Sequence, residues 1–243
     1  MSTLSQGDLL DKRETRIRRM FGAIAPSYDL LNHLLSLNVD RYWRWRTTKL
    51  VPPINTDPIL DVCTGTGDLA LAYARASGHQ VPIMATDFCP EMLVPAREKA
   101  RRAQARSITF LEADTQRLPF ADNLFQITTV AFGLRNVTDT DRGIAEMVRV
   151  TRPGGRVAIL EFSRPRHRIL GGLYQFYFRR VLPLVGQMIS RSKDNAYRYL
   201  PASVQEFPDG EALAQRLRGH GLAEVRFHPF TFGIATLYIG VKP

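Results

Sequence analysis

The chain has 243 residues, of which 44% are hydrophobic and 23% are charged. This composition is typical of a globular protein and excludes collagen-like, low-complexity and wholly disordered classes. The length fits one α/β domain, 1–243, with an inserted segment better than it fits two domains. Two cysteines, Cys63 and Cys89, are too few for a disulfide framework or a structural zinc site. We therefore expect no metal and a cytoplasmic location.

Positive charge is concentrated in two segments. The chain carries 33 Lys and Arg against 23 Asp and Glu, a net charge of +10. Residues 1–50 carry +4, residues 162–200 carry +7 and the remainder carries −1. This distribution indicates either a solvated basic face or a surface that meets nucleic acid or anionic lipid. No apolar run is long enough to span a membrane, and the N-terminus lacks the core of a signal peptide.

Residues 1–53 are expected to form a helical cap. Ser27 can cap one short helix, and Asp40 can cap a second helix whose apolar side chains repeat with helical spacing. Pro52 and Pro53 stop the second helix.

From residue 58 short apolar runs alternate with helical patterns, which predicts a doubly wound, Rossmann-like α/β sheet. The expected strands are Ile59–Cys63, Ile83–Asp87, Ile108–Glu112, Gln126–Ala131 and Arg156–Phe162. The expected helices are Asp68–Ala76, Pro90–Ala105 and Asp139–Val150. Residues 58–162 form the expected core of the sheet, and 163–200 an aromatic, basic insertion. Residues 201–243 then supply a helix near Gly210–Arg218 and an antiparallel pair, Ala223–Pro229 with Ile234–Val241.

The sharpest local feature is the run Asp61-Val-Cys-Thr-Gly-Thr-Gly-Asp68, between an expected strand and an expected helix. Gly65 and Gly67 let the backbone turn tightly and approach a ligand. Asp87 ends the next strand, where a carboxylate can accept the two hydroxyls of a ribose. The pattern indicates a nucleoside cofactor, either S-adenosylmethionine or NAD, whose Gly-x-Gly-x-x-Ala fingerprint is completed by Ala70.

Three features favour S-adenosylmethionine. Asp61 precedes the glycines, where its carboxylate can serve a cationic amino-acid group. Asp114 and Thr115 follow the third strand, where an adenine amino group could be bound. No second domain is available to bind the substrate of a dehydrogenase. The expected cofactor residues are Asp61, Gly65, Gly67, Asp87, Asp114 and Thr115.

These residues resemble the first three motifs of class I S-adenosylmethionine methyltransferases. Longer motifs resemble the menaquinone/ubiquinone biosynthesis C-methyltransferase family. They are Phe21-Gly-x-Ile-Ala-x-x-Tyr-Asp-x-x-Asn-x-x-Leu-Ser36 with Asp40-Arg-x-Trp-Arg44, Leu118-Pro-Phe120 with Phe132-Gly-Leu-Arg-Asn-Val-Thr-Asp139, and Arg149-Val150 followed by Pro153-Gly-Gly155 and Leu160-Glu-Phe-Ser163. The resemblance covers roughly residues 18–243.

The resemblance implies a sheet of six parallel strands and one antiparallel strand, and methyl transfer to a ring carbon of a polyprenyl quinol. It adds Thr66 to the expected cofactor residues. The chain departs from the common class I loop at Cys63, where glycine is usual, and at Ala131, which offers the cofactor no side-chain hydrogen bond. No catalytic base can be carried over from the family pattern.

Methylation of a ring carbon requires an electron-rich ring, which favours the reduced quinol over the quinone. A phenol ordinarily has a pKa near 10, so a neighbouring cation would stabilise the developing phenolate. Arg135, after the fourth strand, is the candidate catalytic residue, with a structural salt bridge as its alternative role. The expected substrate residues are Tyr28, Asp29, Asn32, Arg135 and Asn136, whereas His33 is more often structural in such a setting.

Residues 169–190 combine aliphatic and aromatic side chains with Arg179 and Arg180. They are either part of the core or a groove for a polyprenyl tail at a membrane surface. We expect peripheral attachment to the anionic inner face of the cytoplasmic membrane, with a homodimer left open. A nucleic-acid methyltransferase is disfavoured because Ala131-Phe-Gly-Leu134 replaces the usual aromatic-proline tetrad. Overall resemblance favours demethylmenaquinol over a benzoquinol of the ubiquinone pathway.

Overall fold

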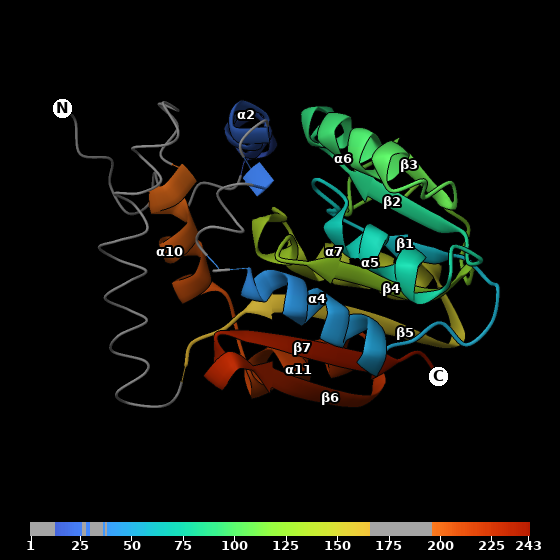
Figure 1. Cartoon of the computed structure of the whole chain (residues 1–243). Helices are drawn as coiled ribbons and strands as arrows, with labels where there is room; N and C mark the ends of the chain where they lie inside the picture. The colour runs from blue at the N-terminus through green and yellow to red at the C-terminus, as the bar shows by residue number, and fades with distance from the viewer. Residues whose placement is uncertain (1–12, 26–27, 30–35, 37, 166–195) are drawn as a thin grey trace.

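The structure is a computed structural model that describes residues 13–25, 28–29, 36, 38–165 and 196–243. Seven strands of this part form one sheet in the order β3-β2-β1-β4-β5-β7-β6 (Figure 1). β7 runs antiparallel to both of its neighbours, and the other paired strands are parallel. The expected α/β class, with six parallel strands and one antiparallel strand, is therefore confirmed. The strands are β1 (Ile59–Asp61), β2 (Ile83–Asp87), β3 (Ile108–Glu112), β4 (Phe125–Ala131), β5 (Thr151–Phe162), β6 (Ala223–Phe230) and β7 (Ala235–Val241).

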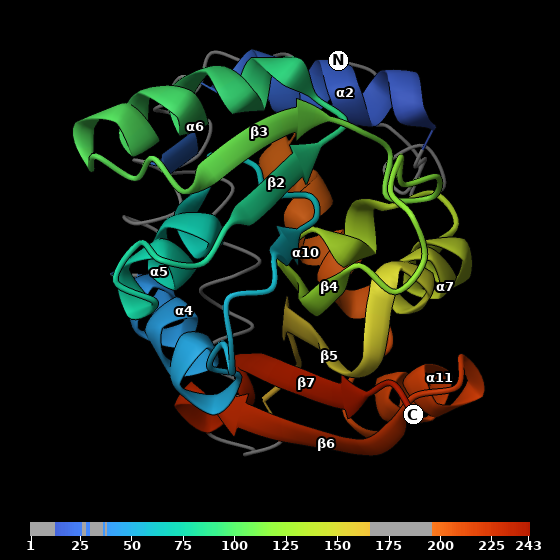
Figure 2. The same cartoon turned by 90° about the vertical axis from the view of Figure 1, so that its right-hand side faces the viewer.

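Helices cover both faces of the sheet (Figure 2). The helices are α2 (Glu14–Ile24), α4 (Val39–Leu50), α5 (Asp68–Ala76), α6 (Pro90–Arg102), α7 (Thr140–Val150), α10 (Ala196–Glu206) and α11 (Glu211–Gly219), with 3-10 turns η2 (Leu134–Asn136) and η4 (Thr231–Gly233). The antiparallel pair β6–β7 and the helix before it lie where the sequence predicts them.

Two hydrophobic cores lie on opposite faces of the sheet. Neighbouring strand residues point to opposite sides, so Ile59 belongs to the core beneath α4 and α5, while Leu60 belongs to the core beneath α7 and α11. Ala158 and Val157 on β5 divide in the same way. Because both faces are buried, these strands are continuous apolar runs rather than alternating ones.

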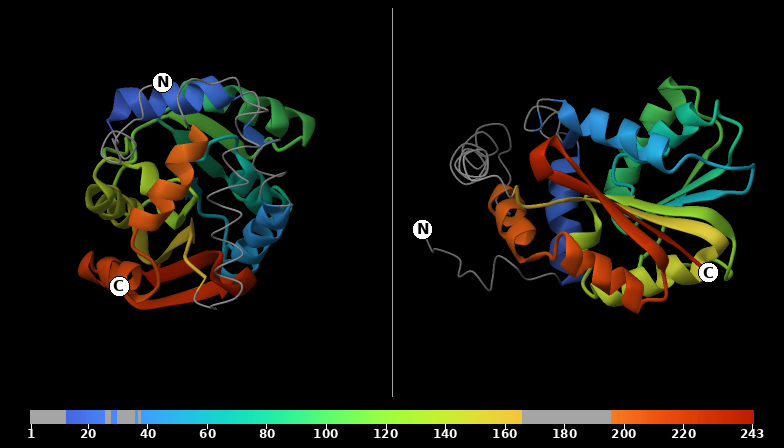
Figure 3. Two further views of the ribbon diagram at one scale, coloured as in Figure 1. Left: turned by 90° about the vertical axis from the view of Figure 1, so that its left-hand side faces the viewer. Right: turned by 90° about the horizontal axis from the view of Figure 1, so that it is seen from below.

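The helices α2 and α10 lie at the carboxyl end of the parallel strands (Figures 1 and 3). Ile17, Met20 and Ile24 on α2 form a small buried cluster with Tyr199 on α10. α2 also contacts α6. The N-terminal segment is therefore held above the edge of the sheet at which a cofactor is expected.

Several element boundaries differ from expectation. Asp40 is not a helix cap: Asn38, in the left-handed region at φ 61°, precedes α4, and the Asp40 carboxylate instead accepts hydrogen bonds from Ser36 (2.6 Å) and Arg44 (2.5 Å). β5 begins at Thr151 rather than Arg156 because Thr151 already pairs with Phe125. β1 ends at Asp61, since Cys63 turns into the left-handed region at φ 48°.

Several residues named above lie outside the described part of the chain. They are Ser27, Asn32, His33, Arg179 and Arg180, together with most of the expected insertion. In the described part, no helix is both long and apolar enough to cross a membrane.

Candidate active site

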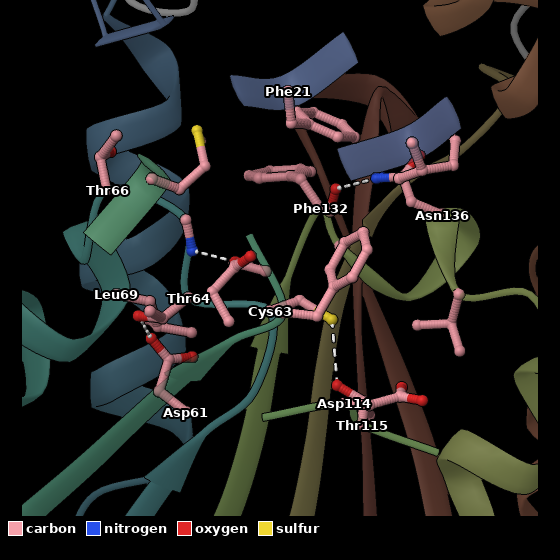
Figure 4. A pocket seen from close by; sticks show the side chains of 18 of the residues that line it. Phe21, Asp61, Cys63, Thr64, Thr66, Leu69, Asp114, Thr115, Phe132 and Asn136 are labelled. Atoms are coloured by element: carbon pink, nitrogen blue, oxygen red, sulfur yellow. Dashed lines mark hydrogen bonds between the residues drawn. The ribbon is translucent and has the colours of Figure 1, made fainter. Parts of the chain in front are cut away.

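A pocket opens at the carboxyl ends of the parallel strands, between the Asp61–Asp68 loop and α2 (Figure 4). The space inside it measures about 880 Å³ when its open mouth is included. Eight of the residues predicted from the sequence line it: Tyr28, Asp61, Gly65, Thr66, Asp87, Asp114, Thr115 and Asn136. Gly67, Asp29 and Arg135 lie outside the lining.

The backbone of the loop explains its glycines. Gly65 has φ 57° and Gly67 has φ 81°, both in the left-handed region that favours glycine. A Cβ atom on Gly67 would also lie 3.3 Å from the Cβ atom of Ala96 and from the ring of Phe110. Gly67 therefore serves the packing of α5 against its neighbours, whereas Gly65 faces the pocket.

Asp87 joins the end of β2 to the loop. Its carboxylate accepts the Gly65 N–H at 2.8 Å and the Cys89 N–H at 2.9 Å. The side chain is buried, and desolvation raises the pKa of Asp87 to about 6 despite these hydrogen bonds. The carboxylate is thus fixed at the pocket wall by two backbone donors, at the position where a ribose is expected.

Asp61 presents an unsatisfied acceptor at the other end of the loop. Its Oδ2 accepts the Thr64 hydroxyl at 2.6 Å, while its Oδ1 is buried without a hydrogen-bond partner. Burial raises the pKa of Asp61 to about 7. A buried acceptor without a donor is costly, and a cationic ammonium group in the pocket would satisfy it. These residues therefore fit the amino-acid end of S-adenosylmethionine.

The expected adenine end is formed by the chain after β3 and the turn after β1. The Thr115 hydroxyl lies 3.2 Å from the Cys63 sulfur (Figure 4), and Asp114 accepts the Gln116 N–H at 2.9 Å. Cys63, the departure from the usual loop glycine, thus contacts an expected cofactor residue. Burial raises the pKa of this thiol, which keeps it protonated at neutral pH.

Lys99 was missed by the sequence analysis. Its ammonium group on α6 pairs with Asp29 at 2.8 Å and with Asp68 at 2.5 Å, and it donates to Thr66 Oγ1 at 3.1 Å. The Thr66 hydroxyl in turn donates to Asp29 at 2.5 Å. Asp29 is therefore bound to the loop rather than exposed in the pocket, and it connects the N-terminal segment to the loop. No spacing along the sequence relates Lys99 or Asp29 to the loop that carries Thr66 and Asp68.

Phe132 joins the pocket to an aromatic cluster behind it. Phe132 lines the pocket, and its ring centroid lies 4.4 Å from that of Phe162 and 5.8 Å from that of Trp43. The Arg44 guanidinium lies over the Phe132 ring at 5.4 Å, while Asp40 neutralises its charge. Phe132 and Trp43 belong to the quoted family motifs, but the sequence did not show that they pack together.

Arg135 occupies the alternative role considered above, a buried salt bridge. Its side chain is 6% exposed and pairs with Glu161 at 2.7 Å, and its Nη1 also donates to the Phe132 carbonyl at 2.5 Å. Its Nε is buried without a hydrogen-bond partner. The neighbouring Asn136 does line the pocket, and its Oδ1 is likewise buried and unpartnered.

Comparison with known structures supports the fold. A methyltransferase of Thermotoga maritima, described as S-adenosylmethionine-dependent and a possible histamine N-methyltransferase, superposes with a TM-score of 0.66 over 93% of this chain and all of that one, at 16% identity. A phosphoethanolamine N-methyltransferase of Haemonchus contortus, solved with S-adenosylhomocysteine, gives a TM-score of 0.61 over 99% of this chain and 61% of that one, at 14% identity. At such identities the likeness concerns the fold alone.

Sequence comparison is more specific. The chain is 45% identical to the ubiquinone/menaquinone biosynthesis C-methyltransferase UbiE of Geobacter sulfurreducens over 96% of this chain and 91% of that protein. It is 46% identical to a demethylmenaquinone methyltransferase of Thermus thermophilus over 92% of this chain and all of that protein. A family model described as the ubiE/COQ5 methyltransferase family matches residues 9–242. With the loop, acids and pocket in place, this protein is an S-adenosylmethionine-dependent methyltransferase that belongs to the ubiE/COQ5 methyltransferase family.

Proposed function

We propose that this methyltransferase transfers a methyl group to a ring carbon of demethylmenaquinol. The observation that carries the proposal is the pocket itself, which is lined both by the cofactor loop and by the aromatic side chains Phe21, Tyr28, Phe88 and Phe132. The names of the relatives supply the ring type, since the Thermus protein is a demethylmenaquinone methyltransferase. The Geobacter relative is named for both quinones, so a benzoquinol is the second candidate.

S-adenosylmethionine supplies a methyl group on a positively charged sulfur, which is already a strong electrophile. The residues of this chain then hold and orient the reactants. Asp61 and the loop around Gly65 receive the amino-acid end, Asp87 the ribose, and Asp114 with Thr115 the adenine. Alignment and exclusion of water account for most of the rate enhancement in this scheme.

The quinol ring is placed against Phe132, whose flat face suits an aromatic substrate. Asn136 orients it, because its unpartnered amide oxygen can accept the hydroxyl of a quinol. Tyr28, which lines the pocket from the N-terminal segment, covers the ring from the other side.

Arg135 has a positioning role in this proposal. Its bonds to the Phe132 carbonyl and to Glu161 hold the turn that carries both Phe132 and Asn136. Direct stabilisation of a phenolate by Arg135, which we expect from the sequence, stays a prediction. The Nε atom of Arg135 has no hydrogen-bond partner among the described residues, so this role can still be tested.

The decisive experiment is an anaerobic assay with dithionite-reduced and with oxidised demethylmenaquinone, with the methyl group of the cofactor isotopically labelled. We expect label in the ring only with the reduced substrate, since the quinone ring is electron-poor. A second assay mixes demethylmenaquinol with the demethylated benzoquinol. The ratio of the two labelled products shows which ring type the enzyme prefers. Equal rates with verified quinone and quinol would contradict the mechanism, and absence of ring label with either ring would contradict the function.

We also propose that the protein is cytoplasmic and visits the membrane surface without spanning it. A polyprenyl substrate resides in the bilayer, and the two basic segments, residues 1–50 and 162–200, favour an anionic surface. Nucleic acid is not needed as a partner. A homodimer is a prediction that sedimentation of the purified protein will decide.

A further inference from the structure

Three large aromatic side chains are exposed on α4 and on the turn between β6 and β7, and a hydrogen bond from Trp43 to Thr231 joins this turn to α4. Tyr42 is 48% exposed, Trp45 50% and Phe232 72%, and no other Phe, Tyr or Trp whose side chain is described reaches the exposed class. The Tyr42 ring lies 5.9 Å from that of Trp45 and 6.5 Å from that of Phe230, which adjoins the turn. We name Tyr42, Trp45 and Phe232 the aromatic patch.

The turn holds Phe232 outward at a conformational cost. Thr231, Phe232 and Gly233 have φ of 45°, 58° and 86°, so two residues with side chains adopt the left-handed region. Hydrogen bonds fix this geometry: Trp43 Nε1 donates to Thr231 Oγ1 at 2.8 Å, and Ser163 Oγ donates to the Gly233 carbonyl at 2.8 Å. Strain maintained to expose a large apolar side chain points to a function for that side chain.

Positive charge accompanies the two aromatic residues of the patch that lie on α4. The helix α4 carries four basic side chains and one acidic one, and the acidic residue, Asp40, is buried and paired with Arg44. Arg41 and Lys49 are exposed, and neither forms an ion pair with another described residue. The exposed side of α4 therefore combines Tyr and Trp with cations that have no ion-pair partner among the described residues.

We infer that the aromatic patch docks the enzyme on the surface of an anionic lipid bilayer. Tyr and Trp favour the headgroup region, where the ring is buried and the polar tip stays hydrated, and Lys and Arg are attracted by anionic headgroups. The choice of lipid over a protein partner rests on the proposed function, which requires a bilayer-resident substrate. This surface differs from the Arg179–Arg180 segment that the sequence suggested.

The position of the patch relative to the pocket supports this choice. The turn that carries Phe232 lies at the same end of the sheet as the pocket, beside the start of α4 (Figures 1 and 3). On the inner side of α4, Trp43 packs against Phe132, which lines the pocket, and Arg44 lines the pocket as well. Docking through Tyr42 and Trp45 thus brings the lipid surface to the outer side of the helix whose inner side borders the pocket.

The test is co-sedimentation of the full chain with vesicles of phosphatidylcholine, with and without phosphatidylglycerol, over a range of salt. The aromatic variants are Trp45→Gln and Phe232→Gly, and glycine suits φ 58° without strain. Their control is Val94→Ser, which removes an apolar side chain of 66% exposure on α6. The charge variant is Arg41→Gln/Lys49→Gln, and its control is Arg117→Gln/Arg142→Gln, which removes the same charge elsewhere. Methylation of a tail-less, water-soluble quinol reports on the active site.

We expect salt-sensitive binding to the anionic vesicles. The charge variant should bind at least about fivefold more weakly, as the loss of even one lysine or arginine contact would produce. Each aromatic variant should also bind more weakly, while both controls bind as the wild type does. Unchanged binding by the charge and aromatic variants, or no binding of the wild type at low salt, would overturn the docking surface. If only the docking surface is wrong, the wild type should still methylate the tail-less quinol. If the proposed function is wrong, the wild type should not methylate it.

Discussion

Gly133 lies so close to Cys63 that a Cβ atom on Gly133 would come within 2.4 Å of the Cys63 Cβ atom. The two residues belong to different turns, Cys63 to the loop after β1 and Gly133 to the chain after β4. Residue 133 must therefore be glycine, because the Cys63 side chain occupies the space that a larger side chain would need. This contact couples the cofactor loop to the turn that carries Phe132 and Asn136.

Replacement of Gly133 should destabilise the protein through this contact. We expect Gly133→Ala to lower the free energy of unfolding by about 1–3 kcal/mol, the usual effect of overpacking. In the double variant Cys63→Gly/Gly133→Ala, the nearest remaining atoms lie 3.3 Å from the new Cβ atom of residue 133. Much of the lost free energy of unfolding should therefore be recovered. Urea denaturation of the wild type, the two single variants and the double variant measures the coupling. Gly219→Ala, where nothing lies within 4 Å of the added Cβ atom, is the control for a glycine replacement without overpacking. Strictly additive effects would show that the two turns are not coupled.

Asp87 should determine cofactor affinity. We expect Asp87→Asn to weaken binding of S-adenosylhomocysteine by about 1–3 kcal/mol, because charge-assisted hydrogen bonds to the ribose are lost. Calorimetry measures the affinity, and circular dichroism shows whether the variant keeps its overall fold. Glu112→Gln, at the exposed end of the neighbouring strand β3, is the matched control. Unchanged affinity in a folded Asp87 variant would place the ribose elsewhere.

Binding of the cofactor product should release protons near neutral pH. Burial raises the pKa of Asp61 to about 7 and that of Asp87 to about 6, both above the ordinary value of 3.8. In the free protein the two carboxyls are therefore partly protonated near pH 6–7. Because these pKa values are raised by folding, protonation of the two carboxyls stabilises the folded state. This stabilisation is complete below about pH 4 and is lost as the pH rises through 6 and 7.

A bound ammonium group and ribose hydroxyls favour the ionised carboxylates. Affinity should therefore rise with pH up to about 7 and level off above it. Calorimetry in buffers of different ionisation enthalpy counts the released protons, and Asp61→Asn should reduce that count. An affinity that is independent of pH between 5 and 8 would indicate that both groups are already ionised in the free protein.

The role of Arg135 can be decided by measuring both the stability of the protein and the pH profile of the reaction. Breaking its buried pair through Glu161→Gln should lower the free energy of unfolding by about 3–5 kcal/mol, since the guanidinium is left uncompensated. If Arg135 positions the turn, Arg135→Lys should lower kcat without shifting the pH profile of the reaction. A shift of the profile to higher pH in the Lys variant would instead indicate that the guanidinium stabilises the phenolate directly.

The strand and loop pattern was readable from the sequence because it depends on local chemistry. Gly65 and Asp87 have fixed positions relative to the strands that precede them, so the loop and the ribose acid follow from spacing alone. The pairing of Lys99 with Asp29 has no such local cause, since the two residues are 70 positions apart. Arg135 shows the same limit, because its partner Glu161 becomes visible only when β4 and β5 pair.

Helix capping and exposure were harder to predict for a physical reason. Asp40 has the right chemistry for a cap, but its pairing with Arg44 one turn later places it inside α4. Phe232 looks like a core residue by composition, yet the left-handed turn directs it into solvent. In each case the sequence alone does not decide between two local options.

The strand order also constrains how the molecule is made. β7 lies between β5 and β6 in the sheet, although it follows both in the chain. During synthesis β6 therefore emerges before the strand on which it pairs, whereas β1 to β5 can assemble as soon as β5 is complete. Closure of this edge is then the last step of sheet assembly. Until it occurs, β6 has no partner strand, and the turn that presents Phe232 has only one of its two supporting strands.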